Sequence, residues 1–129
     1  MEQAVANWVH VARRDIRSAA VLLEAGDTDN ALFLCQQAVE KALKALMQAS
    51  TDEVPPRIHS LMGLSQLAGV WDEMGAERQA VVHAVDPYVT AGRYPPTEAH
   101  LPVGACDEEV GRAISDCREV VDWLLARLR

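Results

Sequence analysis

Apolar residues recur every three or four positions along three long stretches of this chain, which is the spacing of an amphipathic α-helix. The first stretch covers residues 3–25, and the last runs from about Asp107 to Leu128. Their apolar positions are Val5, Val9, Ala12, Ile16, Ala19 and Leu23 in the first, and Val110, Ile114, Cys117, Val121, Leu124 and Leu128 in the last. Residues that favour strands are not gathered into alternating runs, so we predict an all-α protein.

The third stretch, residues 29–47, has the widest apolar surface, and we expect it to be the central helix. Its apolar positions are Leu32, Cys35, Val39, Ala42 and Leu46, broadened by Ala31, Leu34, Ala38, Leu43 and Ala45. An apolar surface of about half the circumference is more than a simple surface helix needs. This helix should therefore contact several neighbours.

The other half of the central helix is polar. Its residues include Gln36, Gln37, Glu40, Lys41 and Lys44, with Phe33 and Met47 standing among them. Glu40 and Lys44 are four residues apart and are expected to form an ordinary ion pair on the helix surface. An aromatic ring and a methionine on a polar face indicate a second contact surface, although single exposed apolar residues also occur without a role.

Turn-forming residues separate these helices. Gly26 should stop the first helix, and either Asp27 or Thr28 can cap the second. Because the connection is short, the first two helices should form an antiparallel hairpin. Residues 50–57 contain two prolines and are expected to form a loop.

Two shorter helices are expected after this loop. Ser60 can cap a helix over residues 61–74, which Gly75 ends, and another begins near Ala76. Their expected buried residues are Leu61, Leu64, Leu67, Ala68 and Trp71 in the first, and Val81, Ala84, Val85 and Tyr88 in the second. Pro87 either kinks the second helix or restarts it with Asp86 as the cap.

Residues 91–104 contain three prolines and two glycines and are expected to form an irregular loop, the kind of segment that often holds functional groups. The expected architecture is therefore a single domain, residues 1–129, folded as an up-and-down bundle of four to five helices.

Composition and charge limit the classes of function. The formal net charge is −7, so contact with RNA or DNA has to be local. The odd number of cysteines, Cys35, Cys106 and Cys117, favours buried thiols in a reducing compartment over a disulfide framework. No apolar run suits a membrane span or a secretion signal, and we expect a cytoplasmic protein.

Cofactor and metal motifs are absent from the sequence. The four histidines include no pair at metal-ligand spacing, and no glycine-rich phosphate loop is present. We expect no metal site and no cofactor. His59, which follows the two prolines, can cap or brace the third helix.

Several short motifs occur together in a fixed order. QQAVEKALKAL spans residues 36–46, HSL residues 59–61 and RYP residues 93–95, and the segment over residues 12–38 precedes them. In combination they resemble the HEPN family, which is named for its occurrence in higher eukaryotes and prokaryotes. The resemblance extends over most of the chain.

This resemblance implies a four- or five-helix bundle that commonly dimerises. In prokaryotes it implies a gene beside that of a minimal nucleotidyltransferase, often as a toxin and antitoxin pair. It also implies that the polar face of the central helix lies near the dimer or partner surface. The candidate binding residues are therefore Phe33, Gln37, Glu40, Lys41 and Lys44, together with Tyr94 of the RYP motif.

Many members of the family are metal-independent ribonucleases in which an arginine and a histidine lie at the dimer interface, with four to six residues between them. Arg93 and His100 have six residues between them, and Tyr94 stands where a polar residue is usual. As a catalytic pair, His100 would remove a proton from an RNA 2′-hydroxyl and Arg93 would hold the phosphate, giving a 2′,3′-cyclic phosphate. The other interpretation makes His100 an exposed loop residue.

Two functions follow from these expectations. The first is a binding module: a homodimer that binds a partner protein, most plausibly a minimal nucleotidyltransferase, with RNA or a nucleotide as a further ligand. The alternative is a metal-independent endoribonuclease toxin that uses Arg93 and His100.

Overall fold

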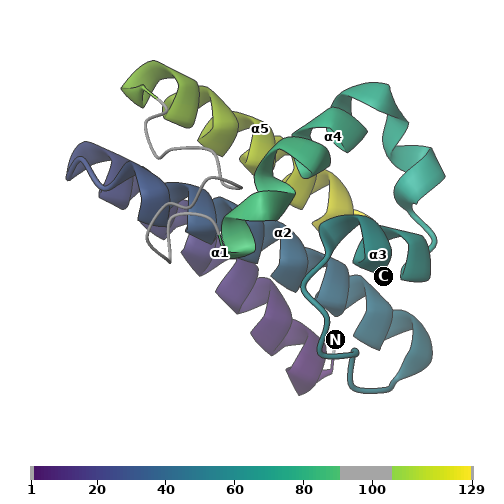
Figure 1. Ribbon diagram of the computed structural model, residues 1–129. Coiled ribbons are helices and arrows are strands. Elements are labelled where there is room, and N and C mark those ends of the chain that lie inside the picture. The colour runs from purple at the N-terminus through teal and green to yellow at the C-terminus, as the bar shows by residue number, and fades with distance from the viewer. Residues whose placement is uncertain (1, 91–105, 129) are drawn as a thin grey trace.

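The computed structural model of the chain describes residues 2–90 and 106–128. Its elements, in chain order, are α1 (Gln3–Glu24), α2 (Thr28–Thr51), α3 (Leu61–Leu67), α4 (Trp71–Val85), the 3₁₀ helix η1 (Asp86–Val89) and α5 (Asp107–Leu125). Figure 1 shows α1, α2 and α5 as the long helices, with the shorter α3 and α4 on one side of them. The predicted all-α bundle is confirmed, and the described residues contain no strand.

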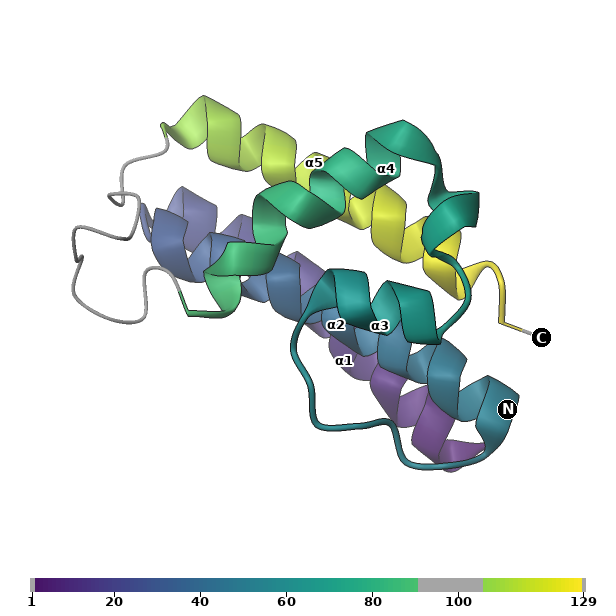
Figure 2. The same ribbon diagram turned by 45° about the vertical axis from the view of Figure 1, so that its right-hand side comes forward.

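The first two helices form the expected antiparallel hairpin, as Figures 1 and 2 both show. Gly26 has a φ of 80°, in the left-handed region that glycine adopts without strain. Asp27, one of the two expected caps, accepts a hydrogen bond from the backbone N–H of Asn30 at 3.4 Å. A glycine stop followed directly by an aspartate cap therefore fixes this turn locally.

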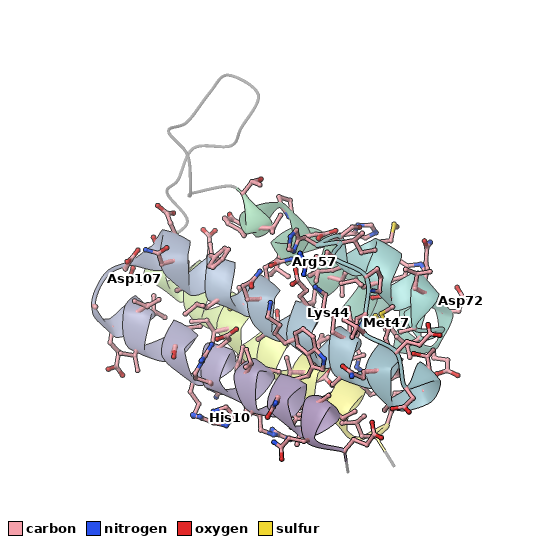
Figure 3. The ribbon with its side chains drawn as sticks, turned by 90° about the horizontal axis from the view of Figure 1, so that it is seen from below. His10, Lys44, Met47, Arg57, Asp72 and Asp107 are labelled. Carbon is pink, nitrogen blue, oxygen red and sulfur yellow. The ribbon has the colours of Figure 1, made fainter. Side chains whose placement is uncertain are left out.

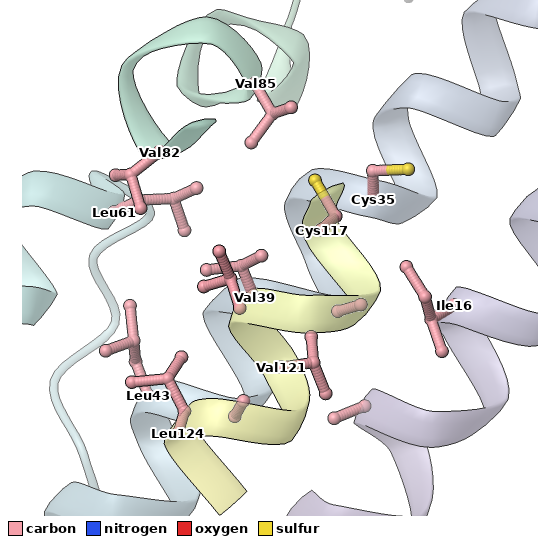
Figure 4. Packing of buried hydrophobic residues seen from close by; sticks show 14 of the residues in the cluster. Ile16, Cys35, Val39, Leu43, Leu61, Val82, Val85, Cys117, Val121 and Leu124 are labelled. Carbon is pink, nitrogen blue, oxygen red and sulfur yellow. The ribbon is translucent and has the colours of Figure 1, made fainter. Parts of the chain in front are cut away.

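Helix α2 is the centre of the bundle, as its wide apolar surface predicted, because every other helix packs against it. Figure 4 shows Val39 and Leu43 of α2 facing Val121 and Leu124 of α5. The helix is longer than expected and continues through Thr51. Residues 50 and 51 therefore belong to α2, and the following Asp52, with a φ of 59°, ends it.

The third predicted helix, over residues 61–74, is wrong as one continuous element. Helix α3 ends at Leu67, and Gly69 takes a φ of 73°, which turns the chain before α4 begins. Leu67, expected to be buried, is 62% exposed because it lies beside this turn. The break expected at Gly75 is present as a non-helical φ of 81° and ψ of 165°, and a helix resumes after it, as expected.

The inward face of α4 also differs from the prediction. Val85 is buried as predicted, and Val81 and Tyr88 pack partly buried against the core, but Ala84 is exposed and Val82 is buried in its place. Asp86 does not cap a restarted helix: its Oδ1 accepts a hydrogen bond from the backbone N–H of Leu61, 2.9 Å away, at the start of α3. The end of α4 is therefore tied to the start of α3.

None of the described helices is both long enough and apolar enough to cross a membrane.

Candidate functional site

The candidate catalytic residues Arg93 and His100, and with them Tyr94, lie outside the described residues. The other candidate site residues all belong to α2. Phe33, Gln37 and Lys41 are half-buried, and Glu40 and Lys44 are buried. The site that can be described therefore lies along the polar face of α2.

Glu40 is not on the surface, so the expectation of an ordinary surface pair with Lys44 is wrong. The Glu40 side chain has no exposed area, and that of Lys44 is only 8% exposed. The polar face of α2 is covered, because the segment that leads into α3 passes beside it and α1 lies close to Lys44. The Lys44 ammonium is 5.8 Å from the centre of the Trp8 ring on α1.

The Glu40 carboxylate has four polar partners. Its Oε1 lies 3.0 Å from Nδ1 of His59 and 3.4 Å from Nε2 of Gln36. Its Oε2 lies 3.0 Å from Nζ of Lys41 and 3.3 Å from Nζ of Lys44. We call the resulting group the Glu40 cluster, and its members are Gln36, Gln37, Glu40, Lys41, Lys44 and His59.

The polar side chains of the cluster also form hydrogen bonds with one another. Lys41 also donates to Oε1 of Gln37 at 2.9 Å, and Gln37 donates to Oε1 of Gln36 at 2.8 Å. Among the described residues, no buried side-chain nitrogen or oxygen lacks a partner. Such a satisfied polar network holds its members in one arrangement.

The charge of Glu40 follows from these contacts. Burial raises the pKa of the carboxyl, but hydrogen bonds from Lys41 and His59 and the positive charges of Lys41 and Lys44 outweigh burial, so its pKa lies below the ordinary 4.5. Glu40 is therefore ionised at neutral pH and can only accept hydrogen bonds. The His59 nitrogen that faces it, Nδ1, must carry a hydrogen.

His59 is the exposed end of the cluster. Its side chain is 59% exposed, and its backbone carbonyl accepts a hydrogen bond from Nε2 of Gln36 at 3.0 Å. Both the ring and the backbone of His59 are thus held by α2. The sequence suggested a cap or brace for α3, but no local pattern indicates that its partners lie 19 and 23 residues earlier in the chain.

An open hollow adjoins His59, between the start of α3 and the end of α4. It is lined by His59, Ser60, His83, Asp86, Pro87 and Val89. The His83 ring meets the Trp71 ring edge to face, with the ring centres 5.3 Å apart. The Ser60 hydroxyl accepts a hydrogen bond from the backbone N–H of Gly63 at 3.1 Å.

A second surface feature is a groove between α4 and α5. Small apolar residues form part of its lining: Ala80, Val81, Ala84 and Ala113. Its charged lining residues are Glu77, Glu109, Asp116 and Glu119, with Arg78 and Arg112. Arg78 is paired with Glu119 at 2.9 Å, so the remaining charge of the groove is mainly negative.

No group of three metal-ligating side chains occurs in the part of the chain that the structure describes.

The sequence and the fold are both similar to those of known proteins. The HEPN domain model matches residues 5–128. The crystal structure of ST0689, an archaeal HEPN homologue, has a TM-score of 0.75 at 25% identity, with 100% of both chains covered. The crystal structure of TT1696 from Thermus thermophilus has a TM-score of 0.74 at 23% identity, with 98% of this chain and 100% of that chain covered, and shows a likeness of fold.

No curated protein matches the chain. The HEPN match nevertheless covers nearly every residue, and the observed bundle agrees with it. The chain therefore belongs to the HEPN domain family.

Proposed function

We propose that this HEPN domain is a binding module that forms a homodimer and binds a partner protein, a minimal nucleotidyltransferase of a toxin–antitoxin pair, with RNA or a nucleotide as a further ligand. The dimer is proposed because HEPN domains commonly dimerise. The observation that carries the partner-binding role is the groove between α4 and α5.

The groove has the shape and chemistry of a docking surface for a helix. Ala80 and Ala84 lie one turn apart on α4 and project no long side chain, so another helix can approach closely. The alanines and Val81 offer apolar contact, while acidic side chains line the edges. This combination is that of an interface with an apolar centre and a charged rim.

The negative charge of the groove indicates what kind of helix can bind there. With Arg78 paired to Glu119, Arg112 is the one remaining positive residue that the structure describes in the groove lining, against Glu77, Glu109 and Asp116. The groove of a second copy carries the same negative charge, so the two grooves of a homodimer would not pair with each other. We assign the groove to a helix of the partner protein that presents lysine or arginine at its edges.

The test is binding between the purified protein and the nucleotidyltransferase encoded beside its gene, measured by titration calorimetry. The double variant Glu109→Lys with Asp116→Lys should weaken binding by at least about tenfold, because like charges would then face the partner across the interface. The control is Glu24→Lys with Glu53→Lys, which changes the net charge equally at exposed positions that do not line the groove.

Equal weakening by both double variants would show a general charge effect and would remove the groove from the proposal. Light scattering of the wild type tests the dimer independently: the expected mass is twice the 14.1 kDa of one chain. A strictly monomeric protein at high concentration would contradict the dimer.

The alternative, a metal-independent endoribonuclease, rests on the sequence positions of Arg93 and His100. It predicts cleavage of single-stranded RNA in a buffer with chelator, lost in both Arg93→Ala and His100→Ala. No cleavage by a folded wild-type dimer would leave the binding module as the function.

A further inference from the structure

His59 lines the hollow, and both its ring and its backbone are held by α2. Nδ1 is turned inward, 3.0 Å from Oε1 of Glu40, and Gln36 holds the His59 carbonyl at 3.0 Å. The other nitrogen, Nε2, is separated from Nδ1 by one ring carbon and projects in a different direction. Because Nδ1 carries the hydrogen in the neutral ring, Nε2 is an acceptor that points away from Glu40.

The remaining lining of the hollow adds one carboxylate acceptor, one hydroxyl donor and apolar surface. Asp86 uses Oδ1 for the backbone N–H of Leu61, and its Oδ2 accepts none from a described residue. The Ser60 hydroxyl accepts from Gly63 and keeps its own hydrogen for donation. Pro87 and Val89 add apolar surface.

The lining determines which chemical group fits. It contains no lysine or arginine among the described residues, so it offers no fork or ammonium for a phosphate. An imidazole acceptor beside a carboxylate instead suits a group that donates hydrogen bonds through hydroxyls. Carboxylates bind the hydroxyls of ribose in this way in other nucleotide-binding proteins.

We propose that the hollow is a binding site for the ribose of a ribonucleoside, with Nε2 of His59 and the Asp86 carboxylate accepting hydrogen bonds from its hydroxyls. Glu40 is the positioning residue, since it fixes the His59 ring without contacting the ligand. The inference deepens the proposed function, resting on its contact with RNA or a nucleotide, and it names the group that is recognised. The ribose can belong to a free nucleoside or to an RNA strand.

The tautomer of His59 is the first measurement. Two-dimensional NMR of the ¹⁵N-labelled protein, recorded on the neutral ring, should show the hydrogen on Nδ1 of His59. A hydrogen on Nε2 would overturn the proposal, since the nitrogen facing the ligand would then be a donor. His10, which projects from the outer side of α1 in Figure 3, is the reference ring.

The second measurement is titration with adenosine and with 2′-deoxyadenosine. Adenosine should shift the amide signals of His59, Ser60 and Val89, and it should bind about fivefold more tightly than the deoxynucleoside, the effect of one hydroxyl hydrogen bond. Equal binding of the two nucleosides, or shifts confined to other parts of the chain, would overturn the proposal.

His59→Asn is the informative variant. An asparagine amide can replace Nδ1–H as the donor to Glu40 but places nothing at the position of Nε2, so the fold contact is kept while the ligand contact is lost. Asp86→Asn likewise keeps an oxygen for the Leu61 N–H and removes the charge. Both variants should abolish the preference for adenosine, whereas His10→Asn should keep it.

A third comparison identifies the source of the ribose. Single-stranded RNA and DNA of the same sequence are compared in a binding assay, wild type against His59→Asn. If the wild type binds RNA more tightly than DNA and His59→Asn does not, the site binds the ribose of an RNA strand. If the wild type binds adenosine but does not distinguish RNA from DNA, the site binds a free nucleotide.

These outcomes separate this inference from the proposed function. RNA binding that is unaffected by His59→Asn and Asp86→Asn would overturn the ribose site in the hollow. The proposed contact with RNA would then still stand. A monomer that binds no nucleotidyltransferase but shows the adenosine preference would overturn the proposed dimer and partner and leave the hollow standing.

Discussion

Replacing Glu40 with glutamine tests whether the Glu40 cluster is a buried charge network. The change is nearly isosteric, and it removes the negative charge that both Lys41 and Lys44 contact. Both ammonium groups lie within 3.3 Å of the carboxylate, and the Lys44 side chain is 8% exposed. The variant therefore leaves a largely buried cation facing a neutral amide.

The expected cost follows from burial. Removing one partner of a fully buried ion pair costs about 3–5 kcal/mol. Two features reduce it here, because Lys41 and His59 have side chains 19% and 59% exposed and can regain water. Glutamine also keeps one oxygen as an acceptor. We therefore expect Glu40→Gln to lower the free energy of unfolding by about 2–4 kcal/mol.

Urea unfolding followed by circular dichroism measures this difference. The control is Glu119→Gln, which removes the partner of Arg78 in a pair whose side chains are 32% and 54% exposed. An exposed pair of this kind contributes about 0–1 kcal/mol. Lys44→Met in the Glu40→Gln background removes the stranded cation and should recover part of the loss, a coupling of about 1–2 kcal/mol.

The pH dependence has a definite sign. The folded-state pKa of Glu40 lies below 4.5, so the unfolded chain binds more protons as the pH falls through this range. The stability that Glu40 contributes is fully present above about 4.5 and is lost as the pH falls toward its folded-state pKa. Glu40→Gln should therefore unfold with a shallower pH dependence in this acidic range.

A loss below about 1 kcal/mol in Glu40→Gln, equal to that of Glu119→Gln, would refute the reasoning. It would mean that water reaches the carboxylate and that the cluster is held as weakly as a surface pair.

Other changes test the backbone turns and the thiols. Gly69→Ala should cost about 1–2 kcal/mol in urea unfolding, because the φ of 73° is unfavourable for a side chain, although no atom lies within 4 Å of the added carbon. Gly111→Ala in α5 is the opposite case: the added carbon would lie 3.6 Å from Leu23, an ordinary contact, and helix propensity should raise stability by about 0.5–1 kcal/mol. For the thiols, a hydrogen bond with Cys35 and burial raise the pKa of Cys117 well above its ordinary value, so a disulfide reagent should titrate only Cys106 quickly in the native protein. Rapid reaction that persists in Cys106→Ser would contradict this assignment.

The sequence alone determined the class and the frame of the fold. Apolar spacings of three and four fixed the long helices, since only one face of a helix can enter the core. Gly26 and Asp27 fixed the first hairpin because a left-handed glycine and a capping carboxylate act on the backbone beside them. The short motifs over α2 and His59 indicated the family that the comparison confirms over residues 5–128.

Local signals were less decisive at Gly69 and Gly75, because the sequence predicted the end of a helix only at Gly75. Gly69 and Gly75 both take positive φ values, and both interrupt helical structure, Gly69 between α3 and α4 and Gly75 within α4. Each glycine permits a turn without requiring one.

The Glu40 cluster was decided by the tertiary structure. On an isolated helix the carboxylate and its lysines form a solvated pair, and the helical pattern placed them on the polar side. In the bundle the segment before α3 brings His59 across that side, from 19 residues further along the chain, and takes Glu40 out of water. Helical periodicity tells which residues share a face. It does not tell what covers that face, because the cover comes from segments distant in sequence whose position depends on the packing of the whole bundle.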